Sequence, residues 1–363
     1  MDSYERLMRA LNFEEPDRVP IWDTTNNLKI VREVGGEGPP EEVCPKACYR
    51  LGLDVGWGIF DLSGIDRSVE RIWETFEWNN LVFEQPLTLR EYRCRNAVYF
   101  VPNVIKRPFK TLEDIRNMKV ELAKSEDELV EEIYSSYCEE KKHYEKYGIP
   151  APAGGEGVIE QLPLLFGWPL LARAIHHGRD VLGKIMDLLL VGSRARVKAA
   201  VEAEAPVFVL CDDIAEKHGL LYPIDFLREM WLPRIKKIIQ PALKAGIPLI
   251  YHSEGNTEAI LNDIIEVGFR GHHPIEPGSM DIKRLKEKFG DRLALLGGID
   301  NWDLLQNGSP KDVEYAVKET IRKVAPGSGF CCGSSGELNP HTPTINAITM
   351  YNAIKKYGMY PKI

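Results

Sequence analysis

The chain has 363 residues, which is enough for two average domains or for one large α/β barrel. Its composition, with 44% hydrophobic, 28% charged and 9% aromatic residues, is typical of a globular protein. The net charge of −8, without a basic block, argues against a nucleic-acid surface, because phosphate binding needs clustered Lys and Arg.

Membrane insertion and secretion are not expected from this sequence. No apolar run approaches the roughly 20 residues that span a bilayer, and the N-terminal stretch "MDSYERLMRALNFEEPDR" lacks the apolar core of a secretory signal. The seven scattered cysteines form no CxxC pair, which favours reduced thiols over a disulfide framework. We therefore expect a cytoplasmic protein with no membrane partner.

Short apolar runs alternate with amphipathic helical stretches along most of the chain. The series opens with "RVPIWDTTNN", and "GLDVGWGIFDLSG" is a candidate second turn. A less regular region at about 80–148 begins with the hairpin-like strands of "LVFEQPLTLREYRCRNAVYFVPN" and continues into helices. After residue 150 the alternation is regular, and its apolar runs include "PVFVLCDD", "IPLIYHSEGN", "FRGHHPIEP", "LALLGGIDN" and "GSGFCCGSSGE".

This alternation of strands with helices predicts βαβ units and a parallel sheet. A Rossmann-type sheet would carry GxGxxG after an early strand, and no strand here is followed by that motif. Polar residues instead follow nearly every strand, as in a (β/α)8 barrel, whose site is built at the carboxyl ends of the strands. We predict an α/β fold: a single distorted (β/α)8 TIM barrel with N-terminal additions, forming one domain over residues 1–363.

Titratable side chains at or just past the predicted strand ends would converge on the mouth of this barrel. They are Asp23, Glu156, Asp212, Asp213, His252, Glu254, Glu276, Asp300, Cys331 and Cys332. Asp212 and Asp213 point to opposite faces of one strand, so at least one should face the mouth. Glu156 lies in "GGEG", where glycines let the backbone approach a ligand or form a turn. Asp300 fits a helix cap as well as a site residue.

The stretch "PLIYHSEGN" places His252 and Glu254 two residues apart, so that both side chains share a face and can hold one ion. Zinc typically takes three protein ligands and keeps one open position, and a cysteine from the last strand would complete the set. A hydrogen-bonding or proton-transfer role for His252 explains the motif equally well. We expect His272 and His273 to be structural or to support the site from behind, with one of them facing the helical layer.

Several stretches between residue 5 and about residue 350 resemble the uroporphyrinogen decarboxylase superfamily. They are "ERLMRALNFEEPDRVPIWD", "DDIAEKHGLLYPIDFLREMWLPRIKKI", "HSEGN", "MDIKRLKEKFGDRLALLGGIDN" and "GELNPHTPTINAI". The resemblance implies one distorted (β/α)8 barrel. True decarboxylases of this superfamily carry an arginine-rich stretch after the first strand, whereas this chain has "WDTTNNLKI" and no arginine there before Arg32. The resemblance therefore points to the corrinoid-dependent methyltransferase branch.

Members of that branch that methylate coenzyme M bind zinc through an H-x-C pair and a later cysteine. In this chain His252 matches the histidine, Glu254 replaces the cysteine, and Gly336 stands at the later position beside Glu337. Carboxylates make a metal site harder than thiolates do, which suits the polarisation of an oxygen better than the activation of a thiol. The shared face of His252 and Glu254, together with this resemblance, predicts one zinc held by His252, Glu254 and a residue of the 331–337 segment, with Cys332 or Cys331 favoured.

These observations predict a methyltransferase that moves a methyl group between a small methylated substrate and the cobalt of a separate corrinoid (cobalamin) protein. A methoxylated aromatic is the favoured substrate, and a methylamine or betaine is the lesser candidate. The expected catalytic residues are His252, Glu254, Asp212 and Asp213. The expected substrate-binding residues are Trp22, Asp23, Trp57, Phe60, Glu156, Asn256 and Asp300.

Two other functions fit the sequence. One is a decarboxylase of a small acid or of a tetrapyrrole, and the other is a non-catalytic protein that binds a corrinoid or a pterin. The many titratable groups at one barrel mouth favour an enzyme over a carrier. The sequence leaves open whether the chain forms a homodimer.

Overall fold

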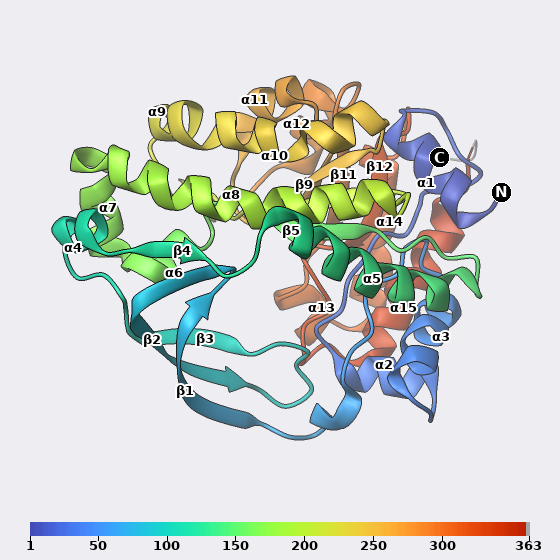
Figure 1. Cartoon of the computed structure of the whole chain (residues 1–363). Coiled ribbons are helices and arrows are strands. Elements are labelled where there is room, and N and C mark those ends of the chain that lie inside the picture. Colours follow the sequence, from blue (N-terminus) through green and yellow to red (C-terminus); the bar gives the residue numbers. More distant parts are fainter. Residues whose placement is uncertain (361–363) are drawn as a thin grey trace.

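A six-stranded parallel sheet forms the centre of the computed structural model, which describes residues 1–360 (Figure 1). The order of the strands across the sheet follows their order along the chain, as in a (β/α)8 barrel. From one edge to the other, the strands are β5 (Ala153–Glu156), β6 (Phe208–Cys211), β9 (Leu249–His252), β10 (Gly271–Ile275), β11 (Ala294–Ile299) and β12 (Phe330–Ser334). All neighbouring pairs are parallel.

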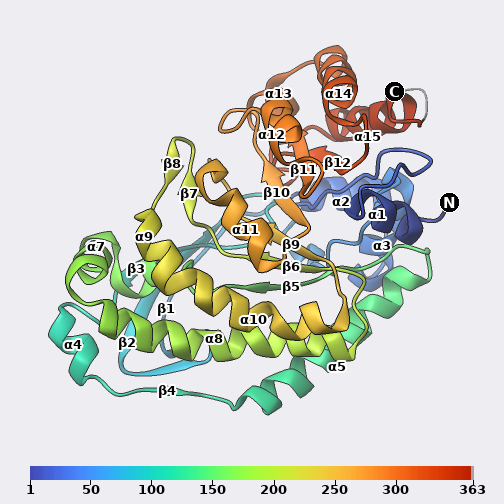
Figure 2. The same ribbon diagram turned by 90° about the horizontal axis from the view of Figure 1, so that it is seen from above.

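Helices connect these strands and cover the outer side of the sheet (Figure 2). Between β5 and β9 they are α6 (Leu162–Phe166), α7 (Trp168–His177), α8 (Arg179–Glu202), α9 (Ile224–Phe226) and α10 (Leu232–Ala245). After β9 they are α11 (Leu261–Val267), α12 (Ile282–Phe289), α13 (Asp303–Asn307), α14 (Pro310–Val324) and α15 (Thr344–Tyr357). Local sequence explains the helix starts: in α14, for example, Ser309 and Asp312 form a reciprocal capping box and Pro310 occupies the first turn.

Two segments, 19–22 and 53–56, lie between β12 and β5 in the ring of strands. Ile21 forms a parallel bridge with Cys332 of β12. The backbone N–H of Asp54 donates to the Ile21 carbonyl at 3.0 Å, and that of Gly56 donates to the Pro150 carbonyl at 2.8 Å. These are single hydrogen bonds and not a continuous ladder, so the ring is distorted at this point. The prediction of an α/β fold of the distorted (β/α)8 type is confirmed.

A buried ion network fixes these first segments to the N-terminal helix α1 (Ser3–Leu11). The Asp54 carboxylate accepts hydrogen bonds from Arg6 Nη1 at 2.7 Å and from Arg18 Nη1 at 2.8 Å. It also accepts a hydrogen bond from the Ile21 backbone N–H at 2.7 Å. The Asp54 side chain is only 1% exposed, so its charge depends on these partners for stabilisation.

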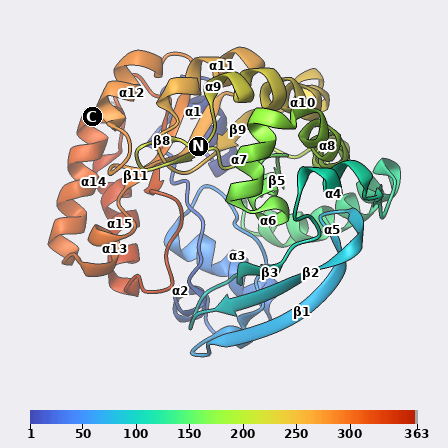
Figure 3. The ribbon, with the colours of Figure 1, turned by 90° about the vertical axis from the view of Figure 1, so that its left-hand side faces the viewer.

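The irregular region contains an antiparallel sheet outside the barrel (Figure 3). Its strands are β1 (Val69–Trp78), β2 (Leu81–Arg93), β3 (Val101–Lys106) and β4 (Val120–Leu122), and α5 (Glu126–Glu145) follows it. Asn79 and Asn80 connect β1 to β2 with φ angles of 46° and 64°, a left-handed conformation that asparagine tolerates in tight hairpins. Leu81, Phe83 and Leu89 of β2 are buried in the same core as α8. The assignment of the whole chain to one domain stays a prediction.

The remaining helices, α2 (Leu28–Gly35), α3 (Pro40–Leu51) and α4 (Leu112–Asn117), pack outside the sheet. Within residues 1–360, no helix is long and apolar enough to cross a membrane.

We predict that Asp54→Ala lowers the free energy of unfolding by about 3–5 kcal/mol, because it leaves buried arginine charge and the Ile21 N–H without their acceptor. Urea denaturation followed by circular dichroism measures this loss. The control is Glu5→Ala, which removes an exposed i,i+4 pair with Arg9 and should change stability by about 0.5 kcal/mol or less. A similar small loss for both variants would contradict the proposed role of the network.

Candidate active site

The carboxyl ends of four neighbouring strands bring four side chains into one row. In the parallel register, Glu156 lies opposite Cys211, Cys211 opposite His252, and His252 opposite His273. In-register residues on parallel strands point to the same face, with about 4.8 Å between strands. Ile250, two residues before His252, belongs to the inner cluster, so the row faces the inside of the barrel.

His252 and His273 form a direct pair at the centre of this row. Their Nδ1 atoms are 2.8 Å apart, so one ring donates and the other accepts. Burial lowers the pKa of His252, although the charge of Asp213 opposes this effect. Burial and the neighbouring histidines lower the pKa of His273 well below its usual value. Both rings are therefore neutral at pH 7 and suited to hydrogen bonding.

His272 and His273 have different surroundings. The His272 ring contacts Thr257 Oγ1 at 2.7 Å and stacks on Tyr251, so it faces the helical layer. The His273 ring lies 6.3 Å from the Trp22 ring, centroid to centroid, on the inner side. Within the described chain, His273 Nε2 is buried and has no hydrogen-bond partner. His273 therefore joins the candidate site as a direct neighbour of His252.

Several carboxylates surround the row, and two of them shape the "HSEGN" segment. The backbone N–H of Glu254 donates to Asp213 Oδ1 at 3.0 Å, and that of Gly255 donates to Glu276 Oε2 at 2.5 Å. Although solvent reaches Glu254, partial desolvation and the charges of Asp213, Glu276 and Glu337 raise its pKa to about 7. Burial and nearby carboxylates, of which Asp213 acts most strongly, raise the pKa of Glu160 to about 8.

No cation balances this group of carboxylates in the part of the chain that the structure describes. The six acidic side chains at the mouth form no ion pair with Lys, Arg or His; they are Glu156, Glu160, Asp213, Glu254, Glu276 and Glu337. Their partners are amide and hydroxyl groups: Glu156, for instance, accepts from Gln161 Nε2 at 2.8 Å, and Glu337 accepts from Asn26 Nδ2 at 3.0 Å. The mouth therefore carries a negative potential that repels anions and provides protonatable groups near neutral pH.

Asp212 holds the loop after β5, and its expected catalytic role stays a prediction. Its carboxylate accepts hydrogen bonds from the backbone N–H groups of Val158, Ile159 and Glu160 at 2.8–3.0 Å, and from Trp231 Nε1 at 2.6 Å. Burial raises its pKa to about 6, and the hydrogen bonds oppose this rise. Both oxygens accept hydrogen bonds, so Asp212 positions the backbone of Glu160.

Other expected site residues also have structural partners. Asp23 is fully buried and accepts from Ser334 Oγ at 2.6 Å and from Tyr351 Oη at 2.9 Å, which fixes β12 to α15. Asp300 accepts from three backbone N–H groups at the start of α13, which is the cap alternative. Asn256 accepts from the Glu258 N–H in a turn. These contacts give the three side chains structural partners, and their assignment to substrate binding stays a prediction.

The aromatic residues predicted to line a pocket lie in two different clusters. Trp22 is 3% exposed and belongs to the inner cluster beside His273. Trp57 is buried among the side chains under α3 and α15, and Phe60 packs against the same cluster. Of the three, Trp22 alone is placed by these contacts beside the row of site residues.

The predicted zinc ligands are not brought together. Cys331 is buried with Leu7 and Leu11 of α1, and Cys332 packs in the separate cluster of the helical layer. β12 is separated from β9 by two strands, a distance of about 14 Å along the sheet. Among residues 1–360, no three His, Cys, Asp or Glu side chains are grouped to hold a metal ion. The residues present therefore do not fit the implied zinc.

Gly336 nevertheless lies where the third ligand of such a site would be expected. A Cβ atom built on Gly336 would stand 3.6 Å from Glu254 Oε1. The segment after β12 thus reaches Glu254 across the mouth, but glycine offers no ligand atom. His252 and Glu254 therefore offer an imidazole and a carboxyl group at the mouth.

Sequence reasoning missed Cys211, His273 and Glu160 as members of this site. Cys211 has the same in-register position as His252, and burial and the charge of Glu160 raise its thiol pKa. Knowledge of the strand register would have found it, because it precedes the Asp pair by one residue. Glu160 lies four residues beyond the end of β5, so strand periodicity gives no signal for it.

Comparison with known proteins identifies the family. Residues 167–357, more than half of the chain, match the family Uroporphyrinogen decarboxylase (URO-D). The chain belongs to this family. The structure superposes on a methyltransferase from Methanosarcina mazei with a TM-score of 0.68 at 21% identity, covering 98% of this chain and 99% of that chain, which shows a shared fold.

Full-length sequence similarity is to methyltransferases of this family. The chain is 25% identical over 360 residues, covering 97% of both chains, to methylcobamide:CoM methyltransferase MtbA from Methanosarcina acetivorans. It is 26% identical to a uroporphyrinogen decarboxylase from Coxiella burnetii, but over 199 residues and 52% of each chain. The resemblance to the superfamily and to its methyltransferase branch is thus confirmed.

We predict that Asp212→Asn lowers the free energy of unfolding by about 2–4 kcal/mol, because an amide NH2 would face buried N–H donors. Asp213→Asn is the matched control and should cost about 1 kcal/mol or less, since Asp213 is less buried and accepts one backbone N–H. Urea unfolding of both variants provides the comparison. A larger loss for Asp213→Asn would contradict the anchoring role of Asp212.

Proposed function

We propose that this protein transfers a methyl group from a small, uncharged methyl donor to the cobalt of a separate corrinoid protein, and that Glu254 protonates the leaving group. The observation that carries the proposal is a carboxyl group with a pKa of about 7 two residues from the neutral His252, at the mouth of a barrel of this family. The full-length similarity to methylcobamide:CoM methyltransferases supports methyl transfer with a corrinoid.

The chemistry assigned to this chain is proton donation and positioning. The reduced corrinoid, a substrate carried by its own protein, supplies the electron pair that forms the new cobalt–carbon bond. The electron pair of the broken carbon–oxygen bond stays on the oxygen, which takes a proton from Glu254. His252, hydrogen-bonded to His273, orients the same oxygen, and the buried inner cluster below the row excludes water.

The carboxylates of the mouth support an uncharged substrate over an anionic one. CoM, the acceptor in the name of the relatives, carries a sulfonate anion, which would have to enter among six acidic side chains without a balancing cation. The substrates of a decarboxylase are carboxylates and meet the same repulsion. A neutral methoxylated aromatic avoids it and gains from a carboxylic acid that is partly protonated at pH 7.

A methylated ammonium compound, such as a methylamine, is the second candidate. The observation that favours it is the same set of unbalanced carboxylates, since these attract a cation. The two candidates differ in the protonation state of Glu254 that they require. A methoxy donor needs the protonated carboxylic acid, whereas an ammonium donor is attracted by the ionised carboxylate.

The proposal is tested by mixing the purified protein with a reduced corrinoid protein from the same organism and following the cobalt spectrum. The panel contains methoxylated aromatics, methylamines, betaine, methanol and methyl-CoM. We expect methylation of the cobalt with a methoxylated aromatic and none with methyl-CoM. A carboxylate panel assayed for carbon dioxide covers the decarboxylase. Absence of any cobalt methylation would refute the proposal.

We predict that Glu254→Gln lowers the rate of methyl transfer from a methoxylated donor to free reduced cobalamin by about 10²–10⁴-fold, because the amide cannot donate the proton. The wild-type rate should fall as the pH rises through about 7, where the raised pKa of Glu254 places loss of the acid form. Glu254→Gln should lose this pH dependence. Glu287→Gln on the exposed face of α12 is the control and should behave as wild type. A rate that rises with pH above 7 would favour the ammonium alternative.

A further inference from the structure

The outer face of the antiparallel sheet exposes large apolar side chains. Ile72 is 61% exposed, Phe76 55%, Val101 69% and Ile105 55%. The pairing of Tyr92 with both Glu70 and Val101 places Ile72, Tyr92 and Val101 on one face, which also carries the exposed Arg90–Glu70 ion pair. Phe76 and Ile105 stand at irregularities of the strand register. The exposed apolar side chains of β1 span about 14 Å from Ile72 to Phe76. Exposed apolar patches of this kind usually mark interaction sites.

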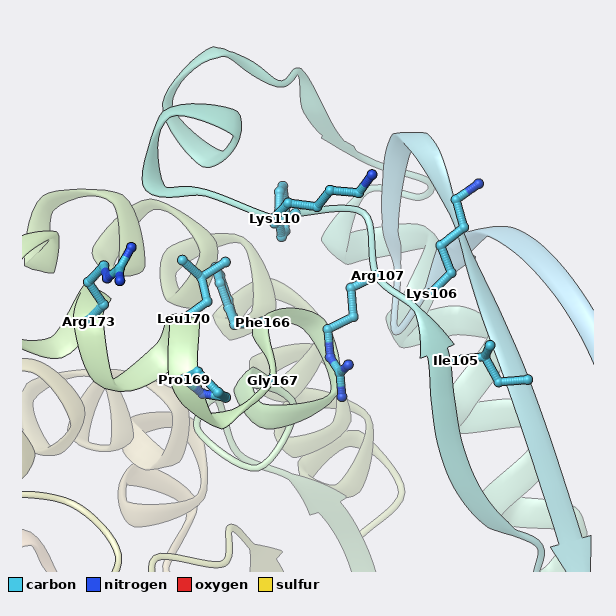
Figure 4. Close-up of a pocket in the computed structure, with 10 residues that line it drawn as sticks. Ile105, Lys106, Arg107, Lys110, Phe166, Gly167, Pro169, Leu170 and Arg173 are labelled. Atoms are coloured by element: carbon cyan, nitrogen blue, oxygen red, sulfur yellow. The ribbon is translucent and has the colours of Figure 1, made fainter.

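A basic pocket of about 490 Å³ continues this face at the end of β3 (Figure 4). Ile105 belongs to both, and Phe109, Phe166 and Leu170 form the apolar wall. The pocket is also lined by four cationic side chains: Lys106, Arg107, Lys110 and Arg173.

These four cations have no acidic partner among residues 1–360, although acidic residues outnumber Lys and Arg by 54 to 46 in the chain. Arg107 Nε donates to the Leu164 carbonyl at 3.1 Å, which leaves its charge unbalanced. In Figure 4, Arg107 points toward Gly167, whereas Lys106 and Lys110 extend away from the ribbon. The pocket therefore offers positive charge to an external group.

The sheet is attached to the mouth of the barrel at three points. Tyr99 Oη donates to Glu337 Oε2 at 2.5 Å, and Asn79 Nδ2 donates to Glu156 Oε2 at 3.2 Å. Trp78 Nε1 donates to Gln161 Oε1 at 2.7 Å. These contacts fix the sheet beside the mouth of the barrel.

We propose that the corrinoid protein docks on the apolar sheet face and the basic pocket, here named together the sheet-and-pocket surface. The part of the partner that binds there is an acidic patch with an apolar centre. The proposal rests on the proposed function, which requires a cobalt-carrying partner at the mouth. Charge favours this surface: acidic partner residues are repelled by the six carboxylates of the mouth and attracted by the four cations of the pocket.

A second copy of this chain is a poorer occupant of the surface. Two-fold association would bring the same patch of each copy together, so the four cations of one would face those of the other. A small anion would fill the pocket but leave the exposed face of β1 and β3 uncovered. A protein partner covers both.

The test compares two acceptors and a charge-reversed triple variant, Lys106→Glu, Lys110→Glu and Arg173→Glu. We expect at least a tenfold rise in KM for the corrinoid protein, with kcat unchanged, and a normal rate with free cobalamin. The wild-type KM should also rise with ionic strength. The matched control reverses three exposed lysines on α10 and α14, Lys236, Lys237 and Lys311, and should leave the KM unchanged.

A second variant, Val101→Asp with Ile72→Asp, tests the apolar face and should weaken the same step. An unchanged KM for the corrinoid protein in both variants would overturn the proposal. An equal loss of rate with free cobalamin would also overturn the proposal, because it would indicate damage to the active site. If inorganic phosphate binds the wild type without displacing the corrinoid protein, the pocket is a small-anion site and the docking proposal is refuted.

Direct binding keeps this inference separate from the proposed function. The affinity of the corrinoid protein is measured without a methyl donor, for wild type, the triple variant and the control. Loss of binding in the triple variant alone supports the docking surface even if no donor is turned over. Equal affinity in all three, or no binding to wild type, overturns it, whereas failure of methylation with intact binding concerns the proposed function alone.

Discussion

The in-register parallel pairing of β5, β6, β9 and β10 is the constraint on which the candidate site depends. It aligns Glu156, Cys211, His252 and His273 on one inner face without any contribution from loop conformation. A shift of one residue in any of these strands would turn its side chain into the helical layer, where His272 now lies. The same burial that positions the row keeps both histidines of the central pair neutral. Burial on the inner face of the sheet therefore accounts for both the position of the row and the neutral state of the two histidines.

The carboxylates around this row serve the fold and the chemistry in different ways. The carboxylate of Asp212 accepts hydrogen bonds from the loop after β5. Asp213 and Glu276 accept hydrogen bonds from the backbone N–H groups of Glu254 and Gly255. Glu254 is thereby surrounded by charges of its own sign, which raises its pKa. The carboxylates that stabilise the acid form of Glu254 are thus the same ones that hold the backbone of its loop. This coupling gives a surface-reachable glutamate the raised pKa that the proposed proton donation requires.

The sequence predicted the barrel, because alternating apolar runs and amphipathic helices depend on local periodicity. It also predicted that Asp212 and Asp213 face opposite ways, since strand geometry requires it. It did not show which of the two faces the mouth, because the backbone N–H groups that bind Asp212 lie 52–54 residues earlier in the chain. The two cysteines of β12 were misplaced for a related reason: their surroundings are decided by α1 and the helical layer, which periodicity does not describe.

Glu254 and Gly336 lie close together across the mouth, and their proximity bears on the proposed chemistry. The two positions meet across the mouth, so the third-ligand place implied by the resemblance is preserved in space while its ligand atom is absent. Gly336 also has a φ angle of 131°, which L side chains rarely adopt, so a cysteine could not be introduced there without strain. The backbone itself thus disfavours a thiolate at this place. A site that offers carboxyl and imidazole groups in place of thiolates is suited to protonating an oxygen, and this agrees with an uncharged methoxy donor.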